Sequence, residues 1–349
     1  MTPESYNKAT DYLTKFYGAE VFTRNGIKHP IVIYPPEPQQ VDDIDSIMGT
    51  LSLEPPSDTP IYDYGYLHTL QNSGRNVFNG VTYSLHYLEQ HPLTLHGQMG
   101  RYFDMLATSG ALENELKQTL ETKLIRLPLR SQMHRTVNVS QTLWHGAGRS
   151  ATIGGACLVV YNDSGTYRAI LARRSNRNAT DPNFYHVLPA FIFQPTHPDM
   201  ALVDWRISRH IYREYLEELF GAAESNVGSS DWIDAHPAMQ DLQHMMNHGA
   251  ASLHLTGITL NLFTLRPEIC ALLLIHDPTW WVRITSENSL TPLDTQSEAQ
   301  DGIITRVPIT SDEALLAELP PYLHTIMPPQ AYAALWLGVD LAREKLAIN

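Results

Sequence analysis

The change of hydrophobic period in the middle of the chain constrains the fold more than any other sequence feature. Residues 156–163 (ACLVVYND) and 167–175 (YRAILARRS) are rich in β-forming residues, and Ser164-Gly165 between them predicts a β-hairpin. Residues 204–221 then space their apolar side chains three and four apart, which predicts an amphipathic helix. A hairpin followed by such a helix indicates an α/β (α+β) protein.

Elements of both kinds continue to the C-terminus. Residues 257–277 predict two strands around Arg266-Pro267, and residues 303–310 predict another strand. Residues 328–347 predict a last helix, which has proline at its start and a broad apolar face. We therefore expect one α/β domain over residues 146–349, entered through a small, flexible stretch at its start.

The first part of the chain, residues 1–145, carries no recognisable motif. Residues 4–18 predict a helix that ends at Gly18, and residues 98–122 also show helical spacing. Residues 27–36 predict a strand that two prolines end. We expect this region to be mainly helical, and its role is unknown.

The charge balance bears on the partners of this protein. The 349 residues include 37 acidic and 24 basic side chains, for a formal net charge of −13. Proteins that neutralise a long run of nucleic-acid phosphates usually show the opposite balance, so we expect no extended nucleic-acid surface. A small anionic ligand needs only a few well-placed basic groups and stays compatible with this composition.

Cysteine usage and hydropathy indicate the compartment. Cys157 and Cys270 both lie in apolar runs, which is typical of reduced core thiols. The N-terminus lacks the pattern of a signal peptide, and no apolar stretch approaches the roughly 20 residues needed to span a bilayer. We therefore expect a cytoplasmic protein without a membrane segment.

One face of the 204–221 helix carries a concentrated set of charges. Glu214 precedes Glu217 by three residues and Glu218 by four, so the three carboxylates can converge on one point. Crowded carboxylates repel one another, which a solvated surface tolerates and a divalent cation relieves. Arg213 lies four residues before Glu217 and can hold that carboxylate. A solvated face with an ion pair and a metal site are both compatible with this pattern.

The run that contains Arg213, Glu214, Tyr215, Glu217 and Glu218 resembles the end of the Nudix signature, R-E-x-x-E-E with an apolar residue after the first glutamate. The predicted order of strands and helices over residues 150–310 also suits that superfamily. The resemblance implies a Nudix-like mixed-sheet α/β/α sandwich in the C-terminal two-thirds of the chain. The N-terminal extension lies outside it.

The resemblance also implies a metal site and a set of roles. Glu217 and Glu218 would bind Mg²⁺ or Mn²⁺, with Glu214 as a third ligand. Arg213 would orient a glutamate, and Glu214 or Glu268 would help to deprotonate water. For Glu268, an exposed turn residue is the simpler interpretation.

The implied substrate is a nucleoside diphosphate derivative such as ADP-ribose or a nucleotide sugar, whose diphosphate bond would be hydrolysed. Arg173 or Arg174, at the end of the second hairpin strand, would hold a phosphate as a bidentate fork. Ordinary surface charge accounts for these two arginines equally well.

Departures from the family pattern support a second hypothesis. Ala190 and Phe191 stand where the family turn has glycines, and Trp205 stands where it has a glutamate. Residues 191–200 lengthen the stretch between turn and helix. The alternative is a catalytically inactive Nudix-like module that senses a nucleotide. A third hypothesis is an interaction protein with a solvated acidic helix face, and a homodimer also stays open.

Overall fold

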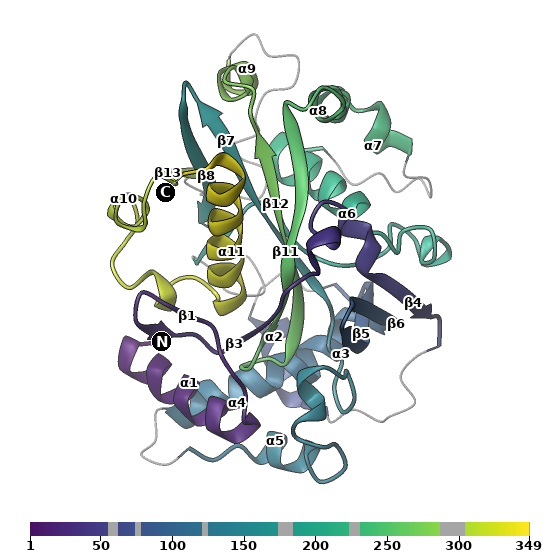
Figure 1. Cartoon of the computed structure of the whole chain (residues 1–349). Coiled ribbons are helices and arrows are strands. Elements are labelled where there is room, and N and C mark those ends of the chain that lie inside the picture. The colour runs from purple at the N-terminus through teal and green to yellow at the C-terminus, as the bar shows by residue number, and fades with distance from the viewer. Residues whose placement is uncertain are drawn as a thin grey trace.

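The computed structural model describes residues 1–54, 62–73, 78–120, 125–173, 184–222, 231–286 and 304–348, which form a mixed α/β protein (Figure 1). Its helices are α1 (Pro3–Tyr17), α2 (Tyr64–Asn72), α3 (Tyr102–Met105), α4 (Ala111–Leu120), α5 (Pro128–Met133), α6 (Ile207–Glu214), α7 (Asp231–Ala235), α8 (Pro237–Asn247), α9 (Trp280–Thr285), α10 (Asp312–Ala317) and α11 (Pro329–Leu346). Two π-helical segments, η3 (Leu106–Gly110) and η6 (Tyr215–Leu219), continue α3 and α6, and shorter 3₁₀ turns are η1 (Pro38–Gln40), η2 (Ile44–Ile47), η4 (Gln141–Leu143), η5 (Pro198–Met200) and η7 (Leu323–Thr325).

Within the described part of the chain, eight strands form the main sheet. They are β3 (Ile31–Tyr34), β7 (Gly154–Asp163), β8 (Thr166–Arg173), β9 (Tyr185–Val187), β10 (Ala190–Ile192), β11 (Ala251–Asn261), β12 (Arg266–Ile275) and β13 (Ile304–Pro308). The order is β13-β8-β7-β12-β11-β3, in which β7 and β12 are parallel and the other neighbours are antiparallel. The strands predicted from residue 156 onward and the last helix are therefore confirmed, except that residues 174–175 lie outside the described residues. The strand predicted over residues 27–36 is instead divided between a short hairpin strand at Ile27–Lys28 and β3.

The β7–β8 hairpin turns at Ser164-Gly165, as predicted, because both residues adopt positive φ values of 53° and 97°. The second turn differs from the prediction. Chain reversal takes place over residues 262–265, and β12 already begins at Arg266. Pro267 lies inside this strand, opposite Leu260 of β11 and one residue before the pairing with β7 begins at Glu268.

Strands β7 and β8 pair with each other only near their turn, and farther from it the short strands β9 and β10 lie between them. β9 pairs with β8 and β10 pairs with β7, while the peptide bond between Leu188 and Pro189 in the connecting turn is cis. The backbone N–H of Cys157 donates to the carbonyl oxygen of Pro189 at 2.9 Å. The Leu188-Pro189 turn thus lies within the sheet, next to the buried centre of β7.

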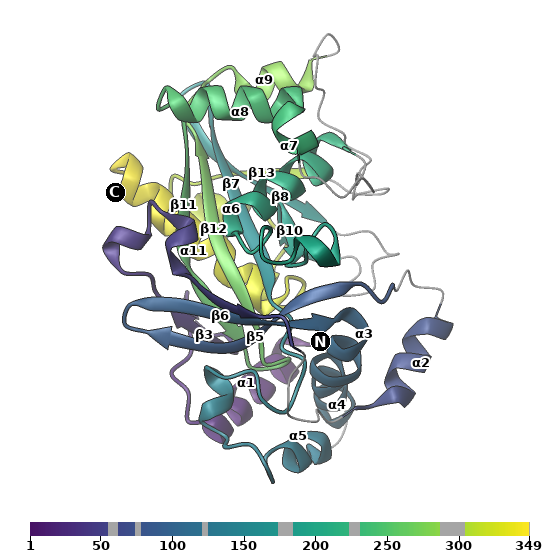
Figure 2. The ribbon, with the colours of Figure 1, turned by 90° about the vertical axis from the view of Figure 1, so that its right-hand side faces the viewer.

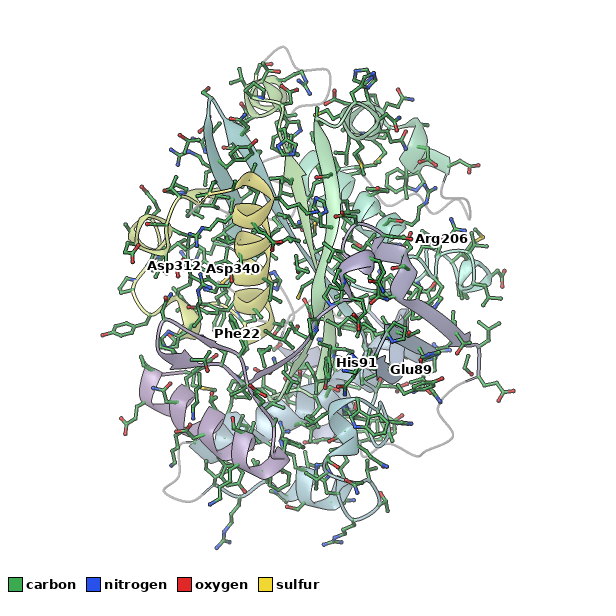
Figure 3. The ribbon with its side chains drawn as sticks, viewed as in Figure 1. Phe22, Glu89, His91, Arg206, Asp312 and Asp340 are labelled. Atoms are coloured by element: carbon green, nitrogen blue, oxygen red, sulfur yellow. The ribbon has the colours of Figure 1, made fainter. Side chains whose placement is uncertain are left out.

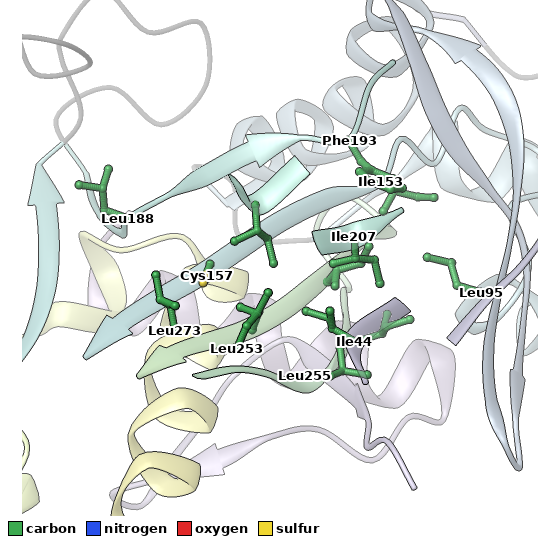
Figure 4. Packing of buried hydrophobic residues seen from close by; sticks show 14 of the residues in the cluster. Ile44, Leu95, Ile153, Cys157, Leu188, Phe193, Ile207, Leu253, Leu255 and Leu273 are labelled. Carbon is green, nitrogen blue, oxygen red and sulfur yellow. The ribbon is translucent and has the colours of Figure 1, made fainter. Parts of the chain in front are cut away.

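Alternation along β7 and β12 sends side chains to two cores, one on each face of the sheet. Leu158 and Leu272 face α11, whose Gly338 lies so close that an added Cβ would be 2.8 Å from Leu158. Cys157 and Leu273 face the other side, where α6 contributes Ile207 (Figure 4). Helices therefore cover both faces of the central strands. Both cysteines are buried and unbridged, as the sequence predicts.

The N-terminal region is less helical than predicted. Helix α1 is confirmed and ends at Gly18 with φ of 60°, but residues 98–101 belong to a strand. Strands β4 (Met48–Ser52), β5 (Val81–Gln90) and β6 (Leu93–Arg101) form a second sheet, and β1 (Thr23–Arg24) with β2 (Ile27–Lys28) forms a small hairpin. The sequence did not predict β5 because this strand is buried on both faces over much of its length and lacks a clean two-residue alternation.

The N-terminal region is built into the rest of the fold. Strand β3 adds to the main sheet beside β11, and β5 and β6 cross its lower end in Figure 2. The backbone of Tyr83 in β5 bonds to both Ile153 and Phe193 at 2.9 Å. One hydrophobic core contains Leu95 from the first region together with Ile153 and Ile207 from the second (Figure 4). No helix among the described residues is long and apolar enough to cross a membrane.

Candidate functional site

Helix α6 and its π-helical continuation η6 form the predicted charged helix. The apolar side chains expected from the spacing lie in the core, and Gly221 adopts φ of 62° just beyond the end of η6. The start of α6 is capped from far away in the sequence. Asp45 of η2 accepts hydrogen bonds from the backbone N–H of Ser208 at 3.0 Å and from its hydroxyl at 2.5 Å. A carboxylate at this end of the helix also interacts favourably with the positive end of the helix dipole.

Arg213 is the best-anchored side chain of the site, with only 5% of it exposed. Its Nη1 donates to the carbonyl oxygen of Gln194 at 3.3 Å, and its Nη2 lies 3.1 Å from Oε1 of Glu214. The Nε of Arg213 is 4.0 Å from Oε1 of Glu217. The guanidinium therefore ties the helix to the loop before it and balances two carboxylates.

His210, one turn earlier on α6, fixes the Arg213 side chain by a hydrogen bond. The Nε2 of His210 lies 2.8 Å from the carbonyl oxygen of Asp204, which can only accept, so Nε2 must carry the proton. Nδ1 is then an acceptor for Arg213 Nη2 at 3.2 Å. Burial, and secondarily the nearby guanidinium, lower the pKa of His210 well below its usual value, so the ring stays neutral.

The three glutamates of this turn point to different partners. Glu214 is held by Arg213, and Oε2 of Glu218 accepts the backbone N–H of Ala190 at 3.0 Å. Glu217 lies on the wall of a pocket. The sequence predicted that they would converge, but among the described residues no group of three or more His, Cys, Asp or Glu side chains is arranged to hold a metal ion. The π-helical turn shifts the angular spacing that an α-helix would have given these residues.

The pocket beside Arg213 and Glu217 has a volume of about 370 Å³. We call it the Arg213 pocket. Its walls come from the start of β5 and the residues before it, from the loop before α6, from α6 and η6, and from α7. The lining residues are Phe78, Asn79, Gly80, Val81, Gln194, Pro195, Thr196, Pro198, Arg213, Glu217 and Trp232. This volume is within the range of about 300–1,000 Å³ that is usual for small-molecule sites.

The loop wall of this pocket is fixed by Asp204. One oxygen of Asp204 accepts both the backbone N–H of Thr196 at 2.8 Å and its hydroxyl at 2.6 Å. Asn79 is fixed on the opposite wall, where its Oδ1 accepts the N–H of Phe103 at 3.1 Å. Sequence reasoning missed Phe78, Asn79 and Trp232, because they come from distant segments and form no local pattern.

Trp205 does not line the Arg213 pocket. It is 7% exposed, and its Nε1 donates to the carbonyl oxygen of Gly49 in β4 at 2.9 Å. A Cβ added to Gly97 of β6 would lie 2.4 Å from the indole ring. This residue therefore joins α6 to the N-terminal sheet.

The other predicted site residues lie elsewhere. Glu268 is buried, not an exposed turn residue. It lies two residues before Cys270 and four before Leu272, so all three side chains share the strand face that α11 covers. Its carboxylate lies over Gly154, where an added Cβ would meet it at 2.3 Å. The charged face of α6 belongs to the opposite side of the sheet, so Glu268 does not join the other predicted residues. Arg173 is the exposed last residue of β8, and Arg174 lies outside the described residues.

Comparison with known proteins assigns no family. No protein-family model matches the chain, and no curated protein matches it. A function is therefore inferred from the residues of the pocket and of α6 themselves.

Proposed function

We propose that the protein binds a nucleotide-type small molecule in the Arg213 pocket and acts as a sensor or regulatory module. The observation that carries this proposal is the composition of the pocket wall. It combines the aromatic rings of Phe78 and Trp232 with an anchored guanidinium–carboxylate pair, Arg213 and Glu217. Aromatic rings offer stacking surfaces to a flat base, worth about 1–3 kcal/mol per stacked base.

Polar groups on the same walls suit the rest of such a ligand. Because Oδ1 of Asn79 is already engaged, its Nδ2 serves as a donor, and the Glu217 carboxylate accepts from ribose hydroxyls or an exocyclic amine. Phe78 is 83% exposed in the structure, and such exposure of a large apolar side chain favours a partner that covers it. The resemblance of the α6 sequence to the Nudix signature supports a nucleotide over other flat molecules.

Two further features favour binding without turnover. Trp205 occupies the family's glutamate position and is used for packing between the sheets. All three helix carboxylates already contact protein groups, since Glu214 and Glu217 pair with Arg213 and Glu218 accepts the Ala190 N–H. The N-terminal region contributes Phe78 and Asn79 to the pocket, so a bound ligand would contact both parts of the chain.

Thermal unfolding tests this proposal, since a ligand that binds only the folded state raises the melting temperature. ADP-ribose, nucleotide sugars, dinucleotides and nucleoside triphosphates would be added with EDTA present. We expect at least one to stabilise the wild type and to stabilise Phe78→Ala less. Tyr64→Ala is the matched control, because Tyr64 is also exposed but does not line the pocket. No stabilisation by any of these compounds would refute the proposal.

Metal-dependent hydrolysis of a diphosphate bond is the second candidate function. The retained trio Glu214, Glu217 and Glu218 on one helical turn favours it, together with the resemblance to the Nudix signature. Their arrangement does not fit a bound Mg²⁺ or Mn²⁺, so we derive no catalytic step. Chromatography of the same ligands after incubation with either metal would detect products. Products from the wild type that vanish in Glu217→Gln would establish the hydrolase and replace the sensor proposal.

A further inference from the structure

A second cluster of reactive side chains lies on the other face of the sheet, at the start of β11. The Nε2 of His254 is 2.7 Å from Oγ of Ser252, and its Nδ1 is 2.6 Å from Oδ1 of Asp42. Ser252 and His254 are two residues apart on one strand, so both side chains point to the face that α11 covers. We propose that Asp42, His254 and Ser252 form a Ser-His-Asp triad that hydrolyses small carboxylic esters.

The tertiary fold brings Asp42 to this place. The carbonyl oxygen of Val41 accepts the N–H of Leu255 at 2.8 Å, which fixes the chain before η2 along the edge of β11. Lys345 of α11 holds the same Oδ1 of Asp42 at 2.7 Å from the other side. Figure 1 shows α11 next to β11 in this part of the molecule. The carboxylate is thereby positioned by a strand edge and a helix together.

The chemistry of the three groups fixes the tautomer of the imidazole. Hydrogen bonds from Lys345, and then the contact with His254, lower the pKa of Asp42, so it is ionised and can only accept. The proton of the neutral ring must therefore be on Nδ1, and Nε2 is left to accept the hydroxyl proton of Ser252. This is the tautomer in which a histidine acts as general base for a serine. Burial keeps the ring neutral by lowering the pKa of His254.

Each step of the reaction has a defined proton path. Oγ of Ser252 bonds to the ester carbonyl carbon while its proton moves to Nε2 of His254. The bond to the alkoxide then breaks, and the departing alcohol takes that proton. Water next bonds to the acyl carbon and gives a proton to Nε2, which returns it to Oγ as the acid leaves. Ser252 is half-buried, so part of this residue is open to solvent.

Covalent labelling tests this inference independently of the nucleotide pocket. A fluorophosphonate probe, located by peptide mass spectrometry, and hydrolysis of p-nitrophenyl acetate would be measured on the full chain. We expect modification of Ser252 and ester hydrolysis that Ser252→Ala lowers at least tenfold. Ser46→Ala is the matched control, because Ser46 is exposed, close to Asp42 in sequence, and donates only to the carbonyl oxygen of Asp43. Absence of labelling at Ser252 in folded wild type would overturn the proposal.

The pH profile separates the triad from an incidental serine. Asp42, Lys345 and His276 are the charged or titratable groups that act on His254. The labelling rate should rise with pH as His254 loses its proton. Lys345→Met removes a charge that lowers the pKa of His254, so the rise should move to higher pH. Asp42→Asn should move it to lower pH and reduce the plateau at least tenfold. Identical profiles in all three proteins would contradict the roles of these groups.

Discussion

The indole N–H of Trp205 donates to the carbonyl oxygen of Gly49 at 2.9 Å, across 156 residues of sequence. The ring also lies against Gly97 and contacts the aromatic ring of Tyr83, whose centroid is 5.0 Å away. Strands β4, β5 and β6 therefore all contact one side chain, which lies two residues before the start of α6. Trp205 therefore connects the N-terminal sheet to the segment that leads into the helix with the candidate site.

Trp205→Ala should cost about 3–5 kcal/mol of unfolding free energy, because a large buried side chain leaves a cavity. Trp205→Phe should keep most of the packing and cost less, mainly the roughly 1–3 kcal/mol of leaving the Gly49 carbonyl without its donor. Urea unfolding followed by circular dichroism measures both. Equal stability of Trp205→Ala and wild type would contradict the packing role.

Gly97→Ala should also destabilise the protein, because the new Cβ would lie 2.4 Å from the Trp205 ring. Overpacking of this kind costs about 1–3 kcal/mol. The cost should largely vanish in the Trp205→Ala background, where the ring is gone. A double-mutant cycle measures this coupling, and additive effects would show that the two residues do not constrain each other.

Arg213→Lys should destabilise the protein by roughly 2–4 kcal/mol, since lysine cannot reproduce the fork that serves Gln194, His210 and the carboxylates. Arg209→Lys is the control, because Arg209 forms its ion pair with the half-exposed Asp234. Exposed pairs contribute about 0–1 kcal/mol. Urea unfolding should separate the two variants, and equal losses would argue against the special role of Arg213.

The loss of unfolding free energy at low pH should depend on Asp312, which Figure 3 labels beside α11. Burial raises the pKa of Asp312, but hydrogen bonds from Arg343 and Arg24 outweigh it and lower the pKa below its ordinary value of 3.8. A lowered folded-state pKa contributes stability that is present above the unfolded-state pKa. That stability is lost as pH falls below about 4, through the folded-state pKa.

Asp312→Asn should therefore lower stability at pH 7 by about 1 kcal/mol and flatten its fall below pH 4. Asp340→Asn is the contrast, because burial raises the pKa of Asp340 despite its bond with Arg24. The raised pKa means that the charged form of Asp340 costs stability at neutral pH. Its replacement should leave stability at pH 7 nearly unchanged, as thermal unfolding across pH 3–7 would show. The opposite order of the two variants would refute this assignment.

Glu268→Gln should leave nucleotide-induced stabilisation unchanged, because Glu268 points to the α11 face and the Arg213 pocket lies on the other side. Differential scanning fluorimetry with the best ligand provides the measurement. Glu217→Gln, tested in parallel, should weaken the effect. A loss of stabilisation in Glu268→Gln that matches the loss in Glu217→Gln would show that the two faces are coupled.

The sequence determined the elements whose signals are local. The turn at Ser164-Gly165, the apolar stripe of α6 that ends at Gly221, and the long helix α11 all follow from side-chain periodicity or from turn residues that accept positive φ. The charged face with Arg213 was predictable for the same reason, since residues three and four apart are neighbours on a helix.

The tertiary structure decided which of those residues act together. Glu268 could have joined the glutamates of α6 and η6, but the two-residue alternation along β12 places its side chain on the opposite face of the sheet, toward α11. The π-helical turn and the Ala190 N–H redirect Glu218. Phe78 and Trp232 meet in one pocket, and Asp42 meets His254, only after distant segments pack together. The periodicity of a sequence shows on which side of its helix or strand a side chain lies. The residue that this side chain then contacts depends on the packing of segments far apart in the chain.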